Sequence, residues 1–274
     1  MPVLYLVGTP IGNLEDITLR AIRILKEVAL IAAEDTRTTG RLLQHYDIKT
    51  PLTSYHEYTK PERIEQLVTQ LANEDVALVS DAGMPGLSDP GYRLVQAAIE
   101  QGIKVVPIPG PSAAVSALIS SGLPTDSFLF LGFLPRQKKA RRSALTEVAA
   151  LPYTLVLYEA PHRLLALLAD IGDILGARQV VIGRELTKLY EEIWRGTVLE
   201  AADYFGQDKV RGEVTVVIAG AEESRLMWDE DAVRAAILAA IQKGASRKDA
   251  AAQIAEQSGW RKRDVYNLTL SVNS

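Results

Sequence analysis

Apolar residues recur along the first part of the chain in two different periods. Short continuous runs such as Val3–Val7 and Val76–Val79 are typical of strands buried on both faces of a parallel sheet. Between the runs, segments such as 64–71 place apolar side chains at helical spacing. This alternation over residues 1–123 predicts an α/β domain with a mostly parallel sheet.

The pattern changes twice further along the chain, which predicts two more regions. A Gly-Pro stretch at 122–125 is typical of a linker, and residues 124–221 then form a second α/β domain. Its expected strands are Phe128–Phe133, Thr154–Tyr158, Val180–Gly183 and Val214–Ala219. Residues 229–274 contain no strand-like run. Helices before and after the turn at Ser258-Gly259, the first capped by Ser246, predict a helix-turn-helix-like module.

Three turns rich in glycine and proline follow predicted strands, at 8–13, 80–91 and 109–114. Ligands of open α/β sheets bind outside the carboxyl ends of the strands, where such turns lie. One turn of this kind is an ordinary connection between a strand and a helix, but three together favour a ligand site. In the second turn, Asp89-Pro90 predicts a helix N-cap followed by proline at the first helical position.

Composition removes several classes of function. The 274 residues include no cysteine, which excludes disulfides, thiolate metal sites and cysteine nucleophiles and suits the cytoplasm. The three histidines lack metal-ligand spacing, so no metal site is predicted. No segment approaches the roughly 20 apolar residues that cross a bilayer. The signatures of P-loop and dinucleotide-binding proteins are missing too.

Eight short motifs occur in a fixed order along the chain. They are 8–13 (GTPIGN), 32–37 (AAEDTR), 80–83 (SDAG), 89–91 (DPG), 109–113 (PGPSA), 132–135 (GFLP), 158–163 (YEAPHR) and 184–188 (RELTK). With these motifs the chain resembles the tetrapyrrole methylase superfamily of S-adenosylmethionine-dependent methyltransferases. Within it, the chain is similar to the branch that methylates small-subunit ribosomal RNA.

The resemblance implies a fold, a reaction and partners. The expected enzyme is a homodimer of two-domain subunits that hold S-adenosylmethionine in the interdomain cleft, and a C-terminal helical extension belongs to this branch. The expected reaction is 2′-O-methylation of a cytidine ribose in the decoding region, on small-subunit (16S) rRNA or the assembled 30S subunit. A membrane is not involved.

The resemblance also implies which residues surround the cofactor. They are Pro10, Asp81, Met84, Ser112, Ala113, Tyr158, Glu159 and Thr187. Met84 departs from the pattern, because this branch more often has threonine there. A sulfonium donor is already activated, so such a site mainly aligns the reacting atoms and requires neither a metal nor a covalent intermediate.

A weakly acidic hydroxyl can lose its proton to a carboxylate during the transfer. Glu34 and Asp35 follow the apolar run 30–33 and are candidates for this role, with Arg37 as a candidate phosphate ligand. The alternative is structural: Asp35 caps the helix that begins at Thr36 and pairs with Arg37.

Two basic runs are candidates for RNA contact. Such runs are usually solvated faces, but two of them in a chain of net charge −4 favour nucleic acid. Their members are Arg136, Lys138, Lys139, Arg141 and Arg142 in the first run and Arg261, Lys262 and Arg263 in the second.

Two other functions remain open. A tetrapyrrole methyltransferase of cobalamin or sirohaem biosynthesis shares the cofactor turns but has no need of the basic run or the helical tail. A non-enzymatic RNA-binding protein could keep the same fold, although the intact turns argue against it.

Overall fold

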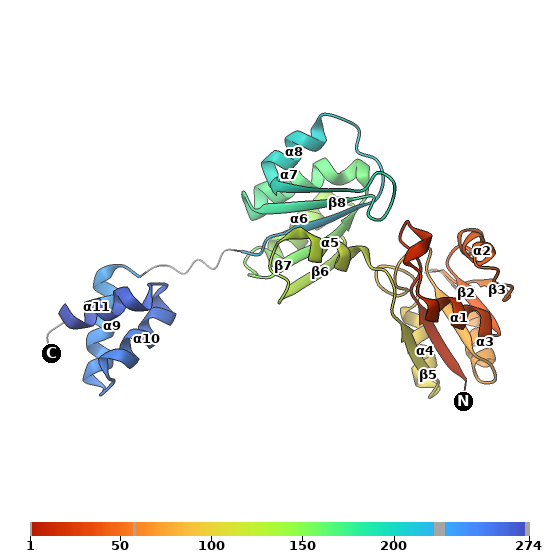
Figure 1. Cartoon of the computed structure of the whole chain (residues 1–274), viewed down its shortest axis with the longest axis horizontal. Helices are drawn as coiled ribbons and strands as arrows, with labels where there is room; N and C mark the ends of the chain where they lie inside the picture. The colour runs from red at the N-terminus through yellow and green to blue at the C-terminus, as the bar shows by residue number, and fades with distance from the viewer. Residues whose placement is uncertain (1, 57–58, 222–227, 272–274) are drawn as a thin grey trace. The chain divides into compact units, whose positions relative to one another are not determined.

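The computed structural model describes residues 2–56, 59–221 and 228–271. Contacts between Cα atoms divide the chain into one unit of residues 1–220 and a second of residues 221–274 (Figure 1). The first unit contains two five-stranded sheets, and the second is helical. The predicted class, two α/β regions followed by a helical segment, is confirmed.

The first sheet has the order β3-β2-β4-β1-β5, and every pair of neighbours is parallel. Its strands are β1 (Val3–Val7), β2 (Leu30–Ala33), β3 (Leu52–Ser54), β4 (Val76–Val79) and β5 (Lys104–Ile108). Its helices are η1 (Leu14–Asp16), α1 (Leu19–Glu27), α2 (Thr36–His45), α3 (Pro61–Leu71) and α4 (Tyr92–Glu100). The predicted parallel arrangement is confirmed.

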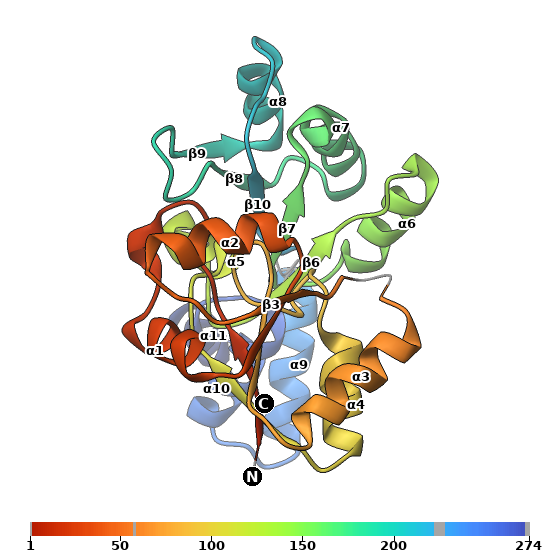
Figure 2. The same cartoon turned by 90° about the vertical axis from the view of Figure 1, so that its right-hand side faces the viewer.

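Helices cover both faces of this sheet, which explains why its central strands are continuously apolar. Ala77 and Val79 pack with α1 and α2, whereas Val76 and Leu78 pack with α3 and α4. Figure 2 shows α1 and α2 on one side of the sheet and α3 and α4 on the other. All four residues of β4 are therefore buried.

The second sheet is mixed, with the order β6-β7-β10-β8-β9. Only β6 and β7 are parallel, and the other neighbours are antiparallel. Its strands are β6 (Phe128–Phe133), β7 (Thr154–Glu159), β8 (Gln179–Arg184), β9 (Glu192–Thr197) and β10 (Val214–Ile218). Strand β9 was not predicted. It lies at the edge of the sheet, and its residues do not alternate between buried and exposed positions.

One face of the second sheet packs against α6 (Lys138–Val148), α7 (Leu164–Leu175) and α8 (Val198–Gly206). The other face packs against α5 (Ala113–Ser121), whose Ala117 and Leu118 contact Val156 and Val217. Helix α5 follows β5 of the first sheet, so the chain crosses between the sheets at the turn 109–112. The predicted domain boundary at 123 lies at the other end of this helix and stays a prediction.

The helical unit consists of α9 (Glu230–Gln242), α10 (Arg247–Ser258) and α11 (Lys262–Ser271). Val233, Ile254 and Val265 belong to a core of its own. Ser246 caps α10 as predicted, by accepting a hydrogen bond from the backbone of Asp249 at 3.1 Å. Gly259 takes a left-handed conformation (φ 72°), which permits the turn before α11.

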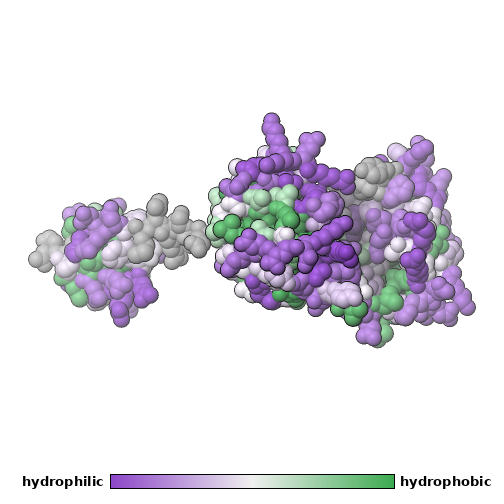
Figure 3. Space-filling model, turned by 90° about the horizontal axis from the view of Figure 1, so that it is seen from above, coloured by the Kyte–Doolittle hydropathy of each residue, from purple (hydrophilic) through white to green (hydrophobic). Residues whose placement is uncertain are grey.

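The surface of the chain is mainly hydrophilic in the view of Figure 3, with separate smaller hydrophobic patches. No helix among the described residues is long and apolar enough to span a bilayer.

The N-cap predicted for Asp89 is wrong. Helix α4 begins at Tyr92, and its N-cap is Gly91, which has a φ of 152° that few side chains tolerate. The Asp89 carboxyl group therefore makes no helix cap.

The structure also corrects the expectation that Arg141 contacts RNA. Its side chain on α6 is only 6% exposed, and its Nη2 lies 2.7 Å from Oδ2 of the buried Asp170 on α7. Arg142 is 35% exposed and pairs with Asp170 and Asp173. These two arginines hold α6 against α7, which removes Arg141 from any RNA surface.

We expect Asp170→Ala to lower the free energy of unfolding by about 3 kcal/mol, because it leaves the Arg141 charge buried without a partner. Asp173→Ala is the matched control; its carboxylate is 64% exposed, so its removal should cost less than about 1 kcal/mol. Urea denaturation measures both. Equal losses in the two variants would contradict this account of the pair.

Candidate functional site

The three predicted turns meet at the carboxyl edge of the first sheet. Their backbones approach closely: a Cβ atom on Gly110 would lie 2.8 Å from the Cα atom of Gly8, so neither turn has room for a side chain at this contact. Thr9 and Gly83 exchange backbone hydrogen bonds of 2.9 and 3.0 Å. The turns after β1, β4 and β5 therefore form one rigid assembly.

A cavity of about 370 Å³ lies beside these turns, within the first unit. Six segments build its wall: the turn after β1, the loop after β4, the start of α5, the end of β6, the end of β7 with the residues just after it, and the start of β10. The lining residues are Ile11, Ala82, Gly83, Met84, Leu87, Ser88, Asp89, Ser112, Ala113, Phe133, Tyr158, Glu159, Ala160, Pro161, Glu213, Val214 and Thr215.

The cavity brings together most of the residues that the resemblance assigns to the cofactor. Met84, Ser112, Ala113, Tyr158 and Glu159 all line it.

The other three predicted residues lie outside this wall. Pro10 precedes the lining residue Ile11, and Asp81 accepts a hydrogen bond of 3.0 Å from the backbone of Asp35. Thr187 lines a neighbouring hollow of about 430 Å³, together with Gly110. Its hydroxyl is buried and has no hydrogen-bond partner among the described residues.

Tyr158 joins the second sheet to the turn from the first. Its hydroxyl accepts a hydrogen bond of 3.3 Å from the backbone of Ala114, at the start of α5. Ser112 caps the same helix. Burial is the main cause that raises the pKa of Tyr158, so its phenol stays neutral at pH 7.

The cavity wall is acidic. It carries the carboxyl groups of Asp89, Glu159 and Glu213, and its described residues include no Lys, Arg or His. The Glu159 side chain is fully buried, and its Oε2 has no hydrogen-bond partner within the described part of the chain. This buried carboxylate oxygen has the capacity to accept a hydrogen bond from a bound donor.

The predicted catalytic group has mainly structural roles. Asp35 caps α2 and accepts hydrogen bonds from the Arg37 backbone and guanidinium, and these bonds lower the pKa of Asp35 to about 2. This is the structural alternative stated above, and it makes Asp35 a weak base. Glu34 Oε2 accepts a hydrogen bond of 3.3 Å from Asp81, which ties the end of β2 to the end of β4. Arg37 is 86% exposed and remains accessible.

Asp89 is a cavity residue that sequence analysis missed. Burial, with smaller contributions from Glu34 and Asp81, raises its pKa to about 6. The Asp-Pro pattern suggested a helix cap, although the DPG motif itself marked the position.

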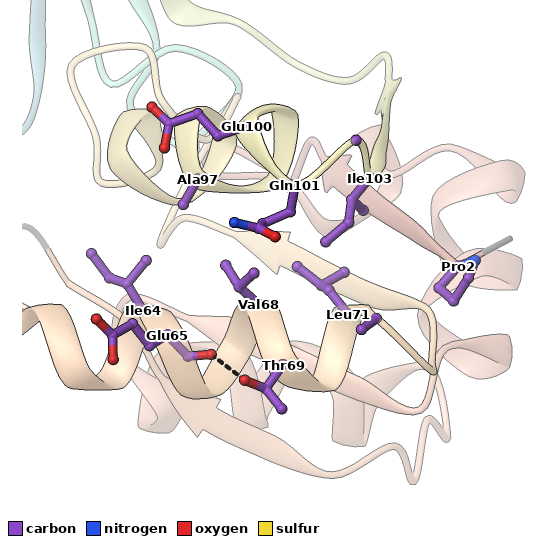
Figure 4. A pocket seen from close by; sticks show the side chains of 12 residues that line it. Pro2, Ile64, Glu65, Val68, Thr69, Leu71, Ala97, Glu100, Gln101 and Ile103 are labelled. Atoms are coloured by element: carbon purple, nitrogen blue, oxygen red, sulfur yellow. Dashed lines mark hydrogen bonds between the residues drawn. The ribbon is translucent and has the colours of Figure 1, made fainter.

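A larger hollow, of about 700 Å³, lies between α3 and α4 (Figure 4). Its wall includes Pro2, just before β1, and Ile103, just before β5, so it opens at the amino edge of the first sheet. Ligands of such sheets bind at the opposite edge, and none of the predicted site residues lines this hollow. The smaller cavity is therefore the candidate site.

The profile of the family described as "Tetrapyrrole (Corrin/Porphyrin) Methylases" matches residues 3–202. The chain belongs to this family. The predicted family is thus confirmed, and the protein is a methyltransferase.

Relatives match along almost the whole chain. A protein of Halalkalibacterium halodurans named "Ribosomal RNA small subunit methyltransferase I" is 52% identical over 97% of this chain and 93% of its own length. A protein of the same name from Synechocystis sp. is 48% identical over 100% of this chain and 99% of its own length.

Solved structures share the fold of this methyltransferase. Uroporphyrin-III-C-methyltransferase from Thermus thermophilus has a TM-score of 0.54 at 22% identity, covering 80% of this chain and 93% of that one. A cobalt precorrin-4 methyltransferase has a TM-score of 0.59 at 14% identity, covering 79% of this chain and 94% of that one.

Proposed function

We propose that this enzyme transfers the methyl group of S-adenosylmethionine to the 2′-hydroxyl of a cytidine in the decoding region of small-subunit rRNA. The observation that carries the proposal is the 52% identity, over 97% of the chain, to a relative named for methylation of this RNA. The coarser conclusion, rRNA methylation, is common to all relatives of that name. The nucleotide and the oxygen are the finer part of the proposal.

The acidic cavity fits the cofactor. Apolar walls at Ile11, Leu87 and Phe133 suit an adenine ring, and the carboxyl groups of Glu159 and Glu213 complement the positive charge of the ligand. The unpartnered Oε2 of Glu159 offers an acceptor to one of the ligand's donors. The cofactor supplies an activated methyl group when bound. The residues that would hold it are Met84, Ser112, Ala113, Tyr158 and Glu159, with Pro10, Asp81 and Thr187 at the margin.

The proposed RNA surface begins close to the cavity. Arg136, Lys138 and Lys139 are exposed and follow Phe133, which lines the cavity and is itself 57% exposed. These three cations can neutralise phosphates of an RNA whose ribose enters the cavity. Arg37 is a further candidate for a phosphate contact.

The helical unit provides a second basic surface. Arg261, Lys262 and Arg263 are all exposed at the start of α11. We assign them to RNA contacts outside the cavity, with naked small-subunit rRNA and the assembled 30S subunit as the two possible forms of the substrate.

We also propose a cytoplasmic homodimer. Leu19, Ile119 and Leu189 are between 71% and 88% exposed, and a contiguous exposed apolar patch is typical of an interaction surface. The elements that carry them are neighbours, because Thr18, Ser116 and Thr187 line one hollow. A second copy of the chain would cover this surface.

A tetrapyrrole substrate is the less favoured alternative. The tetrapyrrole methyltransferases share the fold at 14% and 22% identity, far below the 52% of the relative named for rRNA.

Ribose methylation of small-subunit rRNA should be mapped in cells with and without the gene for this protein. We expect one 2′-O-methylcytidine of the decoding region to disappear without the gene and to return on complementation. Incubating the purified enzyme with naked rRNA and with 30S subunits then identifies the substrate. An unchanged methylation map would contradict the proposed reaction.

Gly110→Ala should weaken binding of S-adenosylhomocysteine at least tenfold, or about 1.4 kcal/mol, because its Cβ would force the turns at Gly8 and Gly110 apart. The control is Gly206→Ala in α8, where a Cβ meets no atom within 4 Å. Calorimetry measures both affinities. Unchanged affinity in Gly110→Ala would place the cofactor elsewhere.

Replacing Arg136, Lys138 and Lys139 together by alanine should flatten the salt dependence of RNA binding. Each lost phosphate contact changes the log–log slope by roughly 0.7 for a single strand, so the triple variant should lose about 2. Affinity for S-adenosylhomocysteine should not change. Filter binding at several salt concentrations gives the slope, and Arg261, Lys262 and Arg263 can be tested in the same way. A slope equal to that of the wild type would remove the run from the RNA surface.

A further inference from the structure

The cavity wall contains three carboxyl groups, and two of them lie beside a cation. Glu159 Oε1 is 3.2 Å from Arg163 Nε, and Glu213 Oε2 is 3.1 Å from Lys188 Nζ. Both glutamates are therefore engaged in ion pairs with their own neighbours.

Asp89 has no ion-pair partner in the part of the chain that the structure describes. The groups that act on its pKa are the Ser80 hydroxyl, which lowers it, and the carboxylates of Glu34 and Asp81, which raise it. The negative charge of Asp89 also contributes to the raised pKa of the Tyr158 phenol. Desolvation and two like charges raise the pKa of Asp89 to about 6, so this carboxylate is a stronger base than an ordinary aspartate and is still mostly ionised at pH 7.5.

The loop after β4 is built so that Asp89 remains available to the cavity. Gly91 takes the N-cap position of α4, and Ser88, at a φ of 62°, turns the chain just before Asp89. A Cβ on Gly91 would lie 3.1 Å from the backbone nitrogen of Gly86, so the two arms of the loop touch. This closed loop holds the carboxyl group in the wall beside Met84 and Ser112.

We propose that Asp89 accepts the proton of the acceptor hydroxyl, an inference that rests on the proposed ribose methylation. The hydroxyl oxygen forms a bond to the methyl carbon while the carbon–sulfur bond breaks. The electron pair of the broken carbon–sulfur bond stays on sulfur. The hydroxyl proton moves to the Asp89 carboxylate, which later releases it to water. Charge balances, because the positive sulfonium and the negative carboxylate are both neutralised.

The test compares Asp89→Asn and Asp89→Glu with the wild type in single-turnover methylation of 30S subunits across pH. The wild-type rate should rise with pH through an inflection near 6. Asp89→Asn should be about 100-fold slower at pH 7.5 and lose the inflection, the size expected for a lost general base. Asp89→Glu should recover part of the rate. Affinity for S-adenosylhomocysteine should stay within about twofold in both variants, a difference of less than about 0.5 kcal/mol.

Thermal unfolding gives a readout that needs no turnover. The pKa of Asp89 is raised from 3.8 to about 6 in the folded state, so its contribution to stability is complete below pH 3.8 and is lost as the pH rises through 6. Asp89→Asn should therefore melt at a higher temperature than the wild type at pH 8, and the difference should vanish below pH 4. Asp173→Asn, at an exposed carboxylate of α7, is the control for both measurements and should keep the wild-type inflection.

The outcomes separate this inference from the proposed function. If the wild type methylates a cytidine ribose and Asp89→Asn does so at the same rate and with the same inflection, Asp89 is not the proton acceptor. A tenfold or greater loss of S-adenosylhomocysteine affinity in Asp89→Asn would also overturn the assignment, in favour of a cofactor contact. If the wild type methylates no ribose, the proposed function itself fails.

Discussion

The contact between Gly8 and Gly110 is the constraint on which the site depends. The two backbones touch because β1 and β5 are hydrogen-bonded neighbours and both end at the same edge of the sheet. The turn after β5 then leads into α5, which packs on the second sheet. A side chain at either glycine would displace the start of α5 and, with it, the hydrogen bond from Ala114 to Tyr158. The same contact thus fixes both the turns and the position of the second sheet beside them.

Sequence patterns predicted the fold where burial is two-sided or strictly periodic. Strand β4 was recognisable because both of its faces are covered, and α10 because Ser246 provides a cap before a helical pattern. The edge strand β9 was missed because none of its residues is fully buried and Glu192, Arg195 and Thr197 leave no apolar run. The start of α4 was misplaced because its N-cap is Gly91, which makes no side-chain cap hydrogen bond. Aspartate is a more common N-cap residue, so the sequence favoured Asp89 instead.

The site could be predicted only in part, and its misassignments have physical reasons. Most residues named for the cofactor line the cavity because motifs at strand ends converge in a parallel sheet. The first basic run was treated as a charge cluster, but Arg141 belongs to a helical stripe with Leu145 and Val148, which faces the core. That spacing was visible in the sequence. The raised pKa of Asp89 was not visible, because it depends first on burial in the folded cavity wall and then on the nearby carboxylates of Glu34 and Asp81.

The parallel first sheet has a consequence for synthesis on the ribosome. Strand β1 is made first, but it pairs only with β4 and β5, and Val3 lies opposite Lys104. At about 5 to 20 residues per second, the ribosome needs roughly 5 to 20 s to add the intervening hundred residues. Until β4 has been made, an apolar strand with unpaired backbone groups on both edges is exposed on the nascent chain, and the edge that pairs with β5 stays unpaired longer. The arrangement that brings the glycine turns together therefore delays closure of the domain until β5 has left the ribosome.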